Sequence, residues 1–170
     1  MNDITQHIAE LNIGRLIAPT DDPRVAEFMD ALDMVNGLGK RMPGFVWMME
    51  GSGEPGTGNT ENSIGDDPQF VANMTVWEDV QSLEHFVFNT VHKKFYDRRE
   101  EWFQILGGQH FVMWYVEAGH KPSLDEAMKR LAYKEKHGDS DYAFGWSYLK
   151  EAQLHVTKSC APTGMETHNV

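Results

Sequence analysis

Aromatic, imidazole and guanidinium side chains recur every three or four residues in one stretch of the sequence. The members of this series are His85, Phe88, His92, Phe95, Arg99 and Phe103. On a helix, residues with this spacing share one face, and aromatic side chains mixed with a few polar groups are typical of a pocket wall. Because an imidazole is mostly neutral near pH 7, we expect His92 to accept a proton from a bound molecule and Arg99 to stabilise the resulting anion. Arg98 and Arg99 are adjacent, so only one of them is expected to face the pocket.

Two hydrogen-bond donors lie on a predicted strand over residues 70–77. Asn73 and Trp77 are separated by an even number of positions, so they share one face of that strand. An amide N–H and an indole N–H on one sheet face can donate to a carbonyl or an oxyanion. We therefore expect both to assist His92. The alternative is that Trp77 belongs to the core and Asn73 satisfies a backbone group.

Other kinds of catalytic centre have little support in the sequence. His85 and His92 are about 10 Å apart along a helix axis, which is too far for one zinc ion. His120 follows Glu117 in a separate turn, Cys160 is the one cysteine, and neither His-Glu-x-x-His nor Gly-x-Ser-x-Gly occurs. We expect no metal ion and no cofactor. The alternative cofactor is haem, with His92 or His85 as its axial ligand.

Composition and charge exclude several classes of function. The 170 residues include 15 basic and 26 acidic side chains, and the net charge of −11 disfavours nucleic acids and anionic membranes as partners. The 5 Trp, 5 Tyr and 9 Phe can bury enough area for a folded domain, and no segment approaches about 18 consecutive apolar residues. A single cysteine and a polar N-terminus favour the cytoplasm. The glycine-rich segment 51–67 is acidic and lacks a Gly-Lys-Ser/Thr ending, so we expect a surface loop there.

Hydrophobic periodicity divides the chain into strands and helices. Strands are predicted at residues 6–17, 45–49, 70–77, 110–116 and 142–148. Helices are predicted from Pro23 to a stop at Gly37 or Gly39, over residues 79–103, and over residues 123–137. Asp22 before Pro23 is typical of a helix start, and Ser123 with Glu126 forms a capping box.

The order strand, helix, strand, strand, helix, strand predicts an α+β fold with a ferredoxin-like antiparallel sheet and helices on one face. A further helix and strand follow at the C-terminal end. We expect a single domain over residues 1–150 and a frayed tail over residues 151–170. The strands at 70–77 and 110–116 are apolar on both faces, whereas a sheet with one solvated face alternates apolar and polar residues. We therefore expect a second copy of the chain to cover the open face, giving a homodimer.

The sequence over residues 6–148 resembles the dimeric α/β-barrel superfamily, and within it a bacterial branch related to the antibiotic-biosynthesis monooxygenases. The residues that carry the resemblance are His7-Ile8-Ala9-Glu10-Leu11-Asn12, Asp22-Pro23-Arg24, Pro43-Gly44-Phe45-Val46-Trp47, Trp77, His92, Arg99-Glu100-Glu101-Trp102-Phe103, Trp114 and Gly119-His120-Lys121-Pro122. The resemblance implies dimers formed through the open sheet face and a pocket between sheet and helices.

Further implications of the resemblance concern single residues. Asn73 and Trp77 match an Asn-x-x-x-Trp pattern of aromatic-polyketide monooxygenases, and Arg98 or Arg99 lies close to where their active-site arginine falls. His92 falls on the helix position where other members carry a pocket histidine. The glycine-rich segment and the helix over 123–137 depart from the short monooxygenases and leave the substrate open.

These observations favour a small-molecule enzyme with an apolar, aromatic-lined pocket. The expected chemistry is proton abstraction from a phenol or carbon acid on an aromatic or polyketide-like substrate, with or without O₂. The expected catalytic residues are His92, Arg99, Asn73 and Trp77, and the expected substrate-binding residues are Phe88, Phe95, Trp102, Phe103, Trp114, His85 and His120. The alternatives are a haem-binding or haem-dependent enzyme, and a non-catalytic binding protein for a small apolar ligand.

Overall fold

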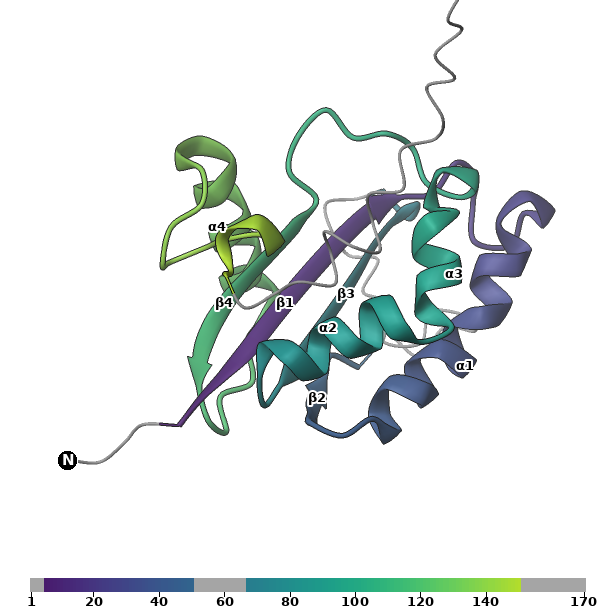
Figure 1. Ribbon diagram of the computed structural model, residues 1–170. Helices are drawn as coiled ribbons and strands as arrows, with labels where there is room; N and C mark the ends of the chain where they lie inside the picture. Colours follow the sequence, from purple (N-terminus) through teal and green to yellow (C-terminus); the bar gives the residue numbers. More distant parts are fainter. Residues whose placement is uncertain (1–4, 51–66, 151–170) are drawn as a thin grey trace, which may run out of the picture.

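A single antiparallel sheet with helices on its faces makes up the domain. The computed structural model describes residues 5–50 and 67–150, so residues 51–66 of the predicted loop over 51–67 and the predicted tail over 151–170 lie outside the described residues. The elements are β1 (Gln6–Arg15), η1 (Pro23–Val25), α1 (Ala26–Arg41), β2 (Phe45–Met48), β3 (Phe70–Trp77), α2 (Val80–Asn89), α3 (His92–Asp97), η2 (Arg99–Glu101), β4 (Phe111–Glu117), α4 (Leu124–His137) and η3 (Trp146–Tyr148) (Figure 1). The strand order β2–β3–β1–β4, antiparallel throughout, confirms the ferredoxin-like fold.

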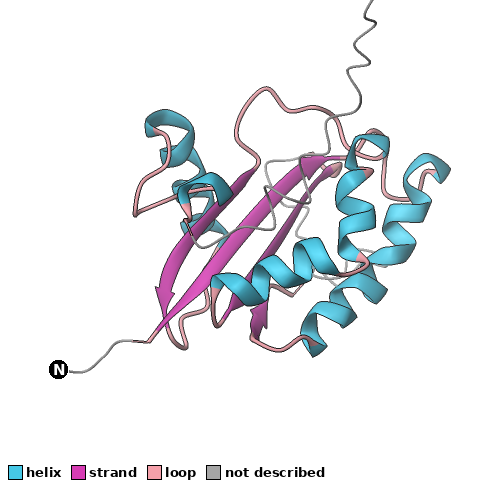
Figure 2. Ribbon diagram, in the orientation of Figure 1, coloured by secondary structure: helices cyan, strands magenta, loops and turns pink. Residues whose placement is uncertain are grey.

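Cross-strand register determines which side chains share a face of the sheet. Glu10 lies opposite Thr75, and Asn12 opposite Asn73, so all four side chains project from the same face. We call this the cavity face, and helices α1, α2 and α3 lie over it (Figure 2). Among the described helices, none is long and apolar enough to cross a bilayer.

The opposite face is apolar, as the strand pattern predicts, and is buried within one chain. Leu11, Met74 and Trp114 belong to one core cluster on this face, and Ala127 and Leu131 of α4 pack into the same cluster. Helix α4 therefore covers part of the surface beside β4 that the sequence argument assigned to a second copy. The homodimer stays a prediction, which analytical ultracentrifugation at micromolar concentration would test.

The predicted long helix over residues 79–103 is wrong, because the chain breaks after α2. Thr90 adopts an extended conformation, with φ −122° and ψ −175°. Its Oγ1 donates to the carbonyl of Phe86 (2.6 Å) and accepts the N–H of His92 (3.2 Å), so one side chain ends α2 and begins α3. The two helices consequently run in different directions (Figure 1).

Two other boundaries differ from the predicted ones. Helix α1 continues through Gly37 and Gly39 to Arg41, because its apolar face packs against the sheet and tertiary packing outweighs the low helix propensity of glycine. The predicted last strand over 142–148 is reduced to one bridge, between Phe144 and Met113, followed by η3. The predicted caps by Asp22 and by Ser123 are confirmed, since each side chain accepts a backbone N–H of the following turn.

Two glycines in and after α1 give opposite expectations for alanine. Gly44 has φ +79°, and an added Cβ would overlap Ser82 Oγ, so Gly44→Ala should destabilise the fold by about 2 kcal/mol or more. Gly37 lies inside α1 with ordinary space around it, so Gly37→Ala should stabilise by about 0.5–1 kcal/mol. Urea denaturation of both variants measures these changes, and equal effects would contradict the account of Gly44.

Candidate active site

A cavity of about 670 Å³ lies between the cavity face and the helices. Its apolar wall includes Phe28, Leu32, Phe86, Phe88, Phe95 and Phe103. Its polar lining includes Glu10, Asn12, Asn73, His92, Arg99, His110 and Lys134. A concave, mostly apolar site with a few convergent polar groups is the usual form of a small-molecule site.

Glu10 is a buried carboxyl group that lines this cavity. Thr75 Oγ1 donates to its Oε1 at 2.7 Å, and Asn12 Nδ2 donates to its Oε2 at 3.3 Å. Burial raises the pKa of Glu10 to about 7, and the hydrogen bonds from Thr75 and Asn12 partly oppose that rise. A carboxyl group with this pKa exchanges a proton readily at neutral pH, which suits general acid–base catalysis.

The indole of Trp77 holds Thr75 in place beneath Glu10. Trp77 Nε1 donates to Thr75 Oγ1 at 2.9 Å, which leaves the Thr75 hydroxyl proton for Glu10. Trp77 is fully buried, and Phe86 stacks on it with ring centroids 5.3 Å apart. Trp77 and Asn73 share the cavity face as predicted, but Phe86 separates Trp77 from the cavity. The prediction that Trp77 donates to a bound oxyanion is therefore wrong, while Asn73 does line the cavity.

His92 begins α3 and lines the cavity beside Phe86, with ring centroids 4.9 Å apart. Its Nδ1 lies 3.2 Å from the carbonyl oxygen of Val87. Because a carbonyl only accepts, Nδ1 carries a proton in this contact and Nε2 of the neutral ring is left as a base. Burial lowers the pKa of His92, and the bond to Val87 opposes this. The ring is therefore neutral at pH 7.

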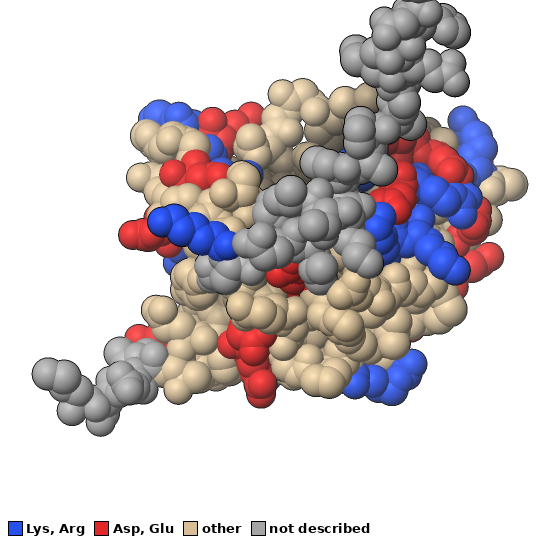
Figure 3. Space-filling view, viewed as in Figure 1, with Lys and Arg blue, Asp and Glu red and all other residues tan. Residues whose placement is uncertain are grey.

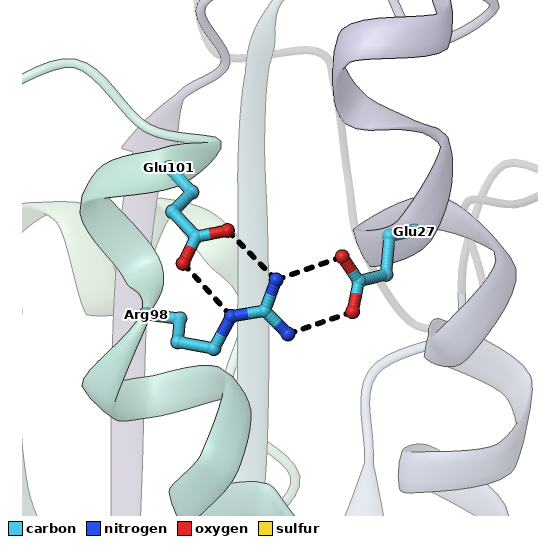
Figure 4. Close-up of polar contacts among 3 residues, drawn as sticks. All are labelled: Glu27, Arg98 and Glu101. Atoms are coloured by element: carbon cyan, nitrogen blue, oxygen red, sulfur yellow. Dashed lines mark hydrogen bonds and ion pairs between the residues drawn. The ribbon is translucent and has the colours of Figure 1, made fainter.

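The two adjacent arginines have separate roles. Arg98 donates two hydrogen bonds to Glu27 of α1 (2.7 and 2.8 Å) and two to Glu101 of η2 (2.8 and 2.7 Å), and Figure 4 shows its guanidinium between the two carboxylates. Acidic and basic side chains are interspersed over the helices α1 and α3 (Figure 3). Arg99 instead lines the cavity, with its guanidinium 4.6 Å from the centroid of the Tyr96 ring. The structure thus assigns the cavity position to Arg99.

Four predicted substrate-binding residues do not line the cavity: Trp114, His120, Trp102 and His85. Trp114 is buried on the opposite face of the sheet and donates to Glu126 of α4 (3.1 Å). His120 pairs with the same Glu126 at 2.8 Å. Trp102 is buried beside the cavity wall, packed against Phe28 and Phe95.

His85 lies outside the cavity, although Phe88 of the same helix α2 lines it. Its ring contacts Asn89 (3.2 Å) on an exposed part of α2. The other members of the predicted stripe all line the cavity: Phe88, His92, Phe95, Arg99 and Phe103. Within residues 5–50 and 67–150, no cluster of three or more His, Cys, Asp or Glu side chains could hold a metal ion.

Sequence reasoning missed Glu10, His110 and Lys134. Glu10 alternates with the apolar Ala9 and Leu11 along β1, and an acidic residue at such a position is usually solvated. The signal lies in the paired strands, which carry Trp77, Met113 and Phe111 toward the same face, and it can be recognised only once the register is known. A carboxylate among such side chains is buried with a hydrogen-bond partner.

The family comparison gives one match and the curated proteins give none. Residues 7–160 match the profile of a family described as a domain of unknown function (DUF3291). A search of curated proteins found no match to this sequence.

Solved structures of low sequence identity are similar to this chain. A conserved protein from Methanosarcina mazei Go1 has 13% identity and a TM-score of 0.46, over 66% of this chain and 93% of that one. A candidate antibiotic biosynthesis monooxygenase from Nitrosomonas europaea has 12% identity and a TM-score of 0.44, over 72% and 99%. A monooxygenase from Streptomyces coelicolor, in complex with nanaomycin D, has 14% identity and a TM-score of 0.38, over 72% and 96%. The ferredoxin-like assignment depends on the strand order of this chain and not on these similarities.

The pKa of Glu10 predicts how stability depends on pH. An unfolded glutamate ionises near 4.5, whereas Glu10 in the folded chain keeps its proton up to about 7. Between these values the folded state binds more protons, so the free energy of unfolding falls as pH rises. This contribution is present in full below pH 4.5 and is lost above pH 7, with a total of about 3 kcal/mol.

Glu10→Gln removes the titration and keeps an acceptor for Thr75. Urea denaturation at pH 5, 6, 7 and 8 should show wild type losing stability relative to Glu10→Gln as pH rises, by about 2–3 kcal/mol over the range. A constant difference between the two proteins would show that Glu10 titrates normally.

Proposed function

This chain belongs to the family described as a domain of unknown function (DUF3291), and we propose that it is a small-molecule enzyme that abstracts a proton from its substrate. The observation that carries the proposal is Glu10, a buried carboxyl with a pKa of about 7 on the wall of an apolar cavity. Placement in a poorly solvated site gives a carboxylate the basicity that proton abstraction near pH 7 requires.

In the proposed reaction a phenol O–H or an acidic C–H bond of the substrate breaks. The proton goes to Glu10, and the electron pair stays on the substrate as a phenolate or carbanion. Asn73 lines the same cavity and supplies N–H donors to the developing negative charge. Nε2 of His92 is a second proton acceptor, placed to receive or return a proton.

The carbanion can react in two ways in the same site. Return of the proton at another atom gives isomerisation or cyclisation, whereas reaction with O₂ gives oxygenation. The apolar wall favours an aromatic or polyketide-like body for the substrate. Oxygen uptake, measured beside substrate consumption, separates the two.

Exchange of substrate hydrogen for deuterium in D₂O tests the proton transfer without knowledge of the product. A panel of phenols and enolisable ketones is incubated with the enzyme, and exchange is followed by NMR. Glu10→Gln should slow exchange by about 10²–10⁴-fold, and His92→Ala by a comparable or smaller factor. Glu78→Gln is the matched control, since Glu78 is exposed, does not line the cavity and should exchange at the wild-type rate. Unchanged exchange in Glu10→Gln would overturn the proposal, and tight binding without any exchange would favour a non-catalytic binding protein.

Haem binding is a second candidate, favoured by one contact of His92. The proton on Nδ1 is held by the Val87 carbonyl, an arrangement common among metal-bound histidines, so Nε2 would be left to hold haem. His92 would be the protein ligand, with the aromatic wall against the ring, and haem would supply redox chemistry when bound. A haemin titration should then give a saturable Soret band that His92→Ala removes and His85→Ala retains. The absence of saturable binding to wild type would eliminate this candidate.

A further inference from the structure

Three cationic or titratable side chains from separate parts of the chain line the same cavity. Arg99 follows α3, His110 precedes β4, and Lys134 belongs to α4. The proposed proton transfer uses none of the three. Arg99 and His110 are exposed, whereas Lys134 is largely buried, and its position needs a separate explanation because desolvating a cation is unfavourable without a partner.

Lys134 is held at the cavity by fixed contacts. Its Nζ donates to Gln109 Oε1 (2.6 Å) and to the carbonyl oxygen of Phe111 (3.2 Å), the residues on either side of His110. Only 11% of its side chain is exposed. Burial lowers the pKa of Lys134, and the nearest carboxylate, Asp139, lies at the 4.0 Å limit of an ion pair. The ammonium group is thus fixed in place with weak charge compensation.

Arg99 and His110 extend this positive region. Arg99 donates to the carbonyl oxygen of Tyr96 (2.8 Å) and lies over its ring, and within the described chain no carboxylate pairs with its guanidinium. Burial lowers the pKa of His110, and the charges of Arg99 and Lys134 lower it further. His110 is therefore a neutral hydrogen-bonding group between two cations.

The carboxylates that line the cavity do not cancel these charges. Asp139 accepts the backbone N–H of Gly145 (3.1 Å), and Glu100 is exposed. Glu10 carries its charge only above a pH of about 7 and projects from the sheet. None of these three carboxylates makes an ion pair with Arg99, and Asp139 reaches Lys134 only at 4.0 Å.

We propose that Arg99, His110 and Lys134 form a subsite for an acidic group, so that the substrate is an apolar organic acid. Such a molecule places its apolar body against the aromatic wall and its anion on the guanidinium and ammonium groups, which gain a closer charged partner than the described carboxylates provide. The inference rests on the proposed function for its substrate, but it concerns binding alone.

Two fluorescent probes that differ by one anionic group test this subsite. 8-Anilinonaphthalene-1-sulfonate carries a sulfonate, and N-phenyl-1-naphthylamine is the same ring system without it. Arg99→Met and Lys134→Met should each weaken binding of the sulfonate probe about five- to tenfold and change binding of the neutral probe less than twofold. Lys129→Met is the matched control on α4, since its side chain is 69% exposed and lies outside the cavity.

Each outcome separates the subsite from the proposed function. If both variants bind the sulfonate probe as wild type does, or weaken the two probes equally, the acidic-group subsite is wrong while the proton transfer of Glu10 is untouched. If neither probe binds wild type, the subsite is also wrong, and the cavity does not accept aromatic molecules. Loss of sulfonate affinity in Arg99→Met alone would support the subsite even where Lys134→Met folds poorly. Absence of deuterium exchange in the wild-type protein, with intact probe selectivity, would overturn only the catalytic role.

Discussion

The turn of the chain at Thr90 is the constraint on which the cavity depends. In a helix that continued past Asn89, the carbonyl of Phe86 would accept the backbone N–H of Thr90. Here the Thr90 hydroxyl donates to that carbonyl instead, and the same hydroxyl oxygen accepts the N–H of His92 at the start of α3. Because α3 departs from the line of α2, Phe88 and Phe95 enclose space against the sheet. The same turn places His92 at the start of α3, where its Nδ1 reaches the Val87 carbonyl.

A clamp of ion pairs holds the wall that this turn creates. Arg98 binds Glu27 and Glu101 with two hydrogen bonds each, and so joins α1 to η2 (Figure 4). All three side chains are partly exposed, and each ion pair contributes little to stability in water. The ion pairs of Arg98 act instead by fixing geometry. A guanidinium bound on two edges has one orientation, and this fixes the backbone at the neighbouring Arg99.

The sequence predicted what depends on local pattern and missed what depends on distant pairing. The strand order and the aromatic stripe follow from periodicity. Most members of the stripe still line the cavity despite the break at Thr90, because they lie close to the new helix ends. The break itself was missed, since Thr90 lies inside a helical pattern and acts through its own hydroxyl. Glu10 was missed because its burial depends on which residues lie opposite it on β3 and β4, and register cannot be obtained from one strand. Lys134 belongs to a helix outside the ferredoxin-like order, so no pattern within that order pointed to it.

The proposed base, Glu10, and the cations of the proposed subsite, Arg99 and Lys134, can both act only if they serve different parts of the bound substrate. An anion bound beside Glu10 would repel its carboxylate and raise its pKa beyond the neutral range, which would leave it protonated and unable to act as a base. Cations beside Glu10 would lower its pKa and reduce its basicity. The hydrogen bonds to Glu10 come instead from neutral groups, Thr75 and Asn12, so burial sets its pKa near 7. An acidic substrate is therefore compatible with this base only when its anion binds elsewhere, and Arg99 and Lys134 provide that place.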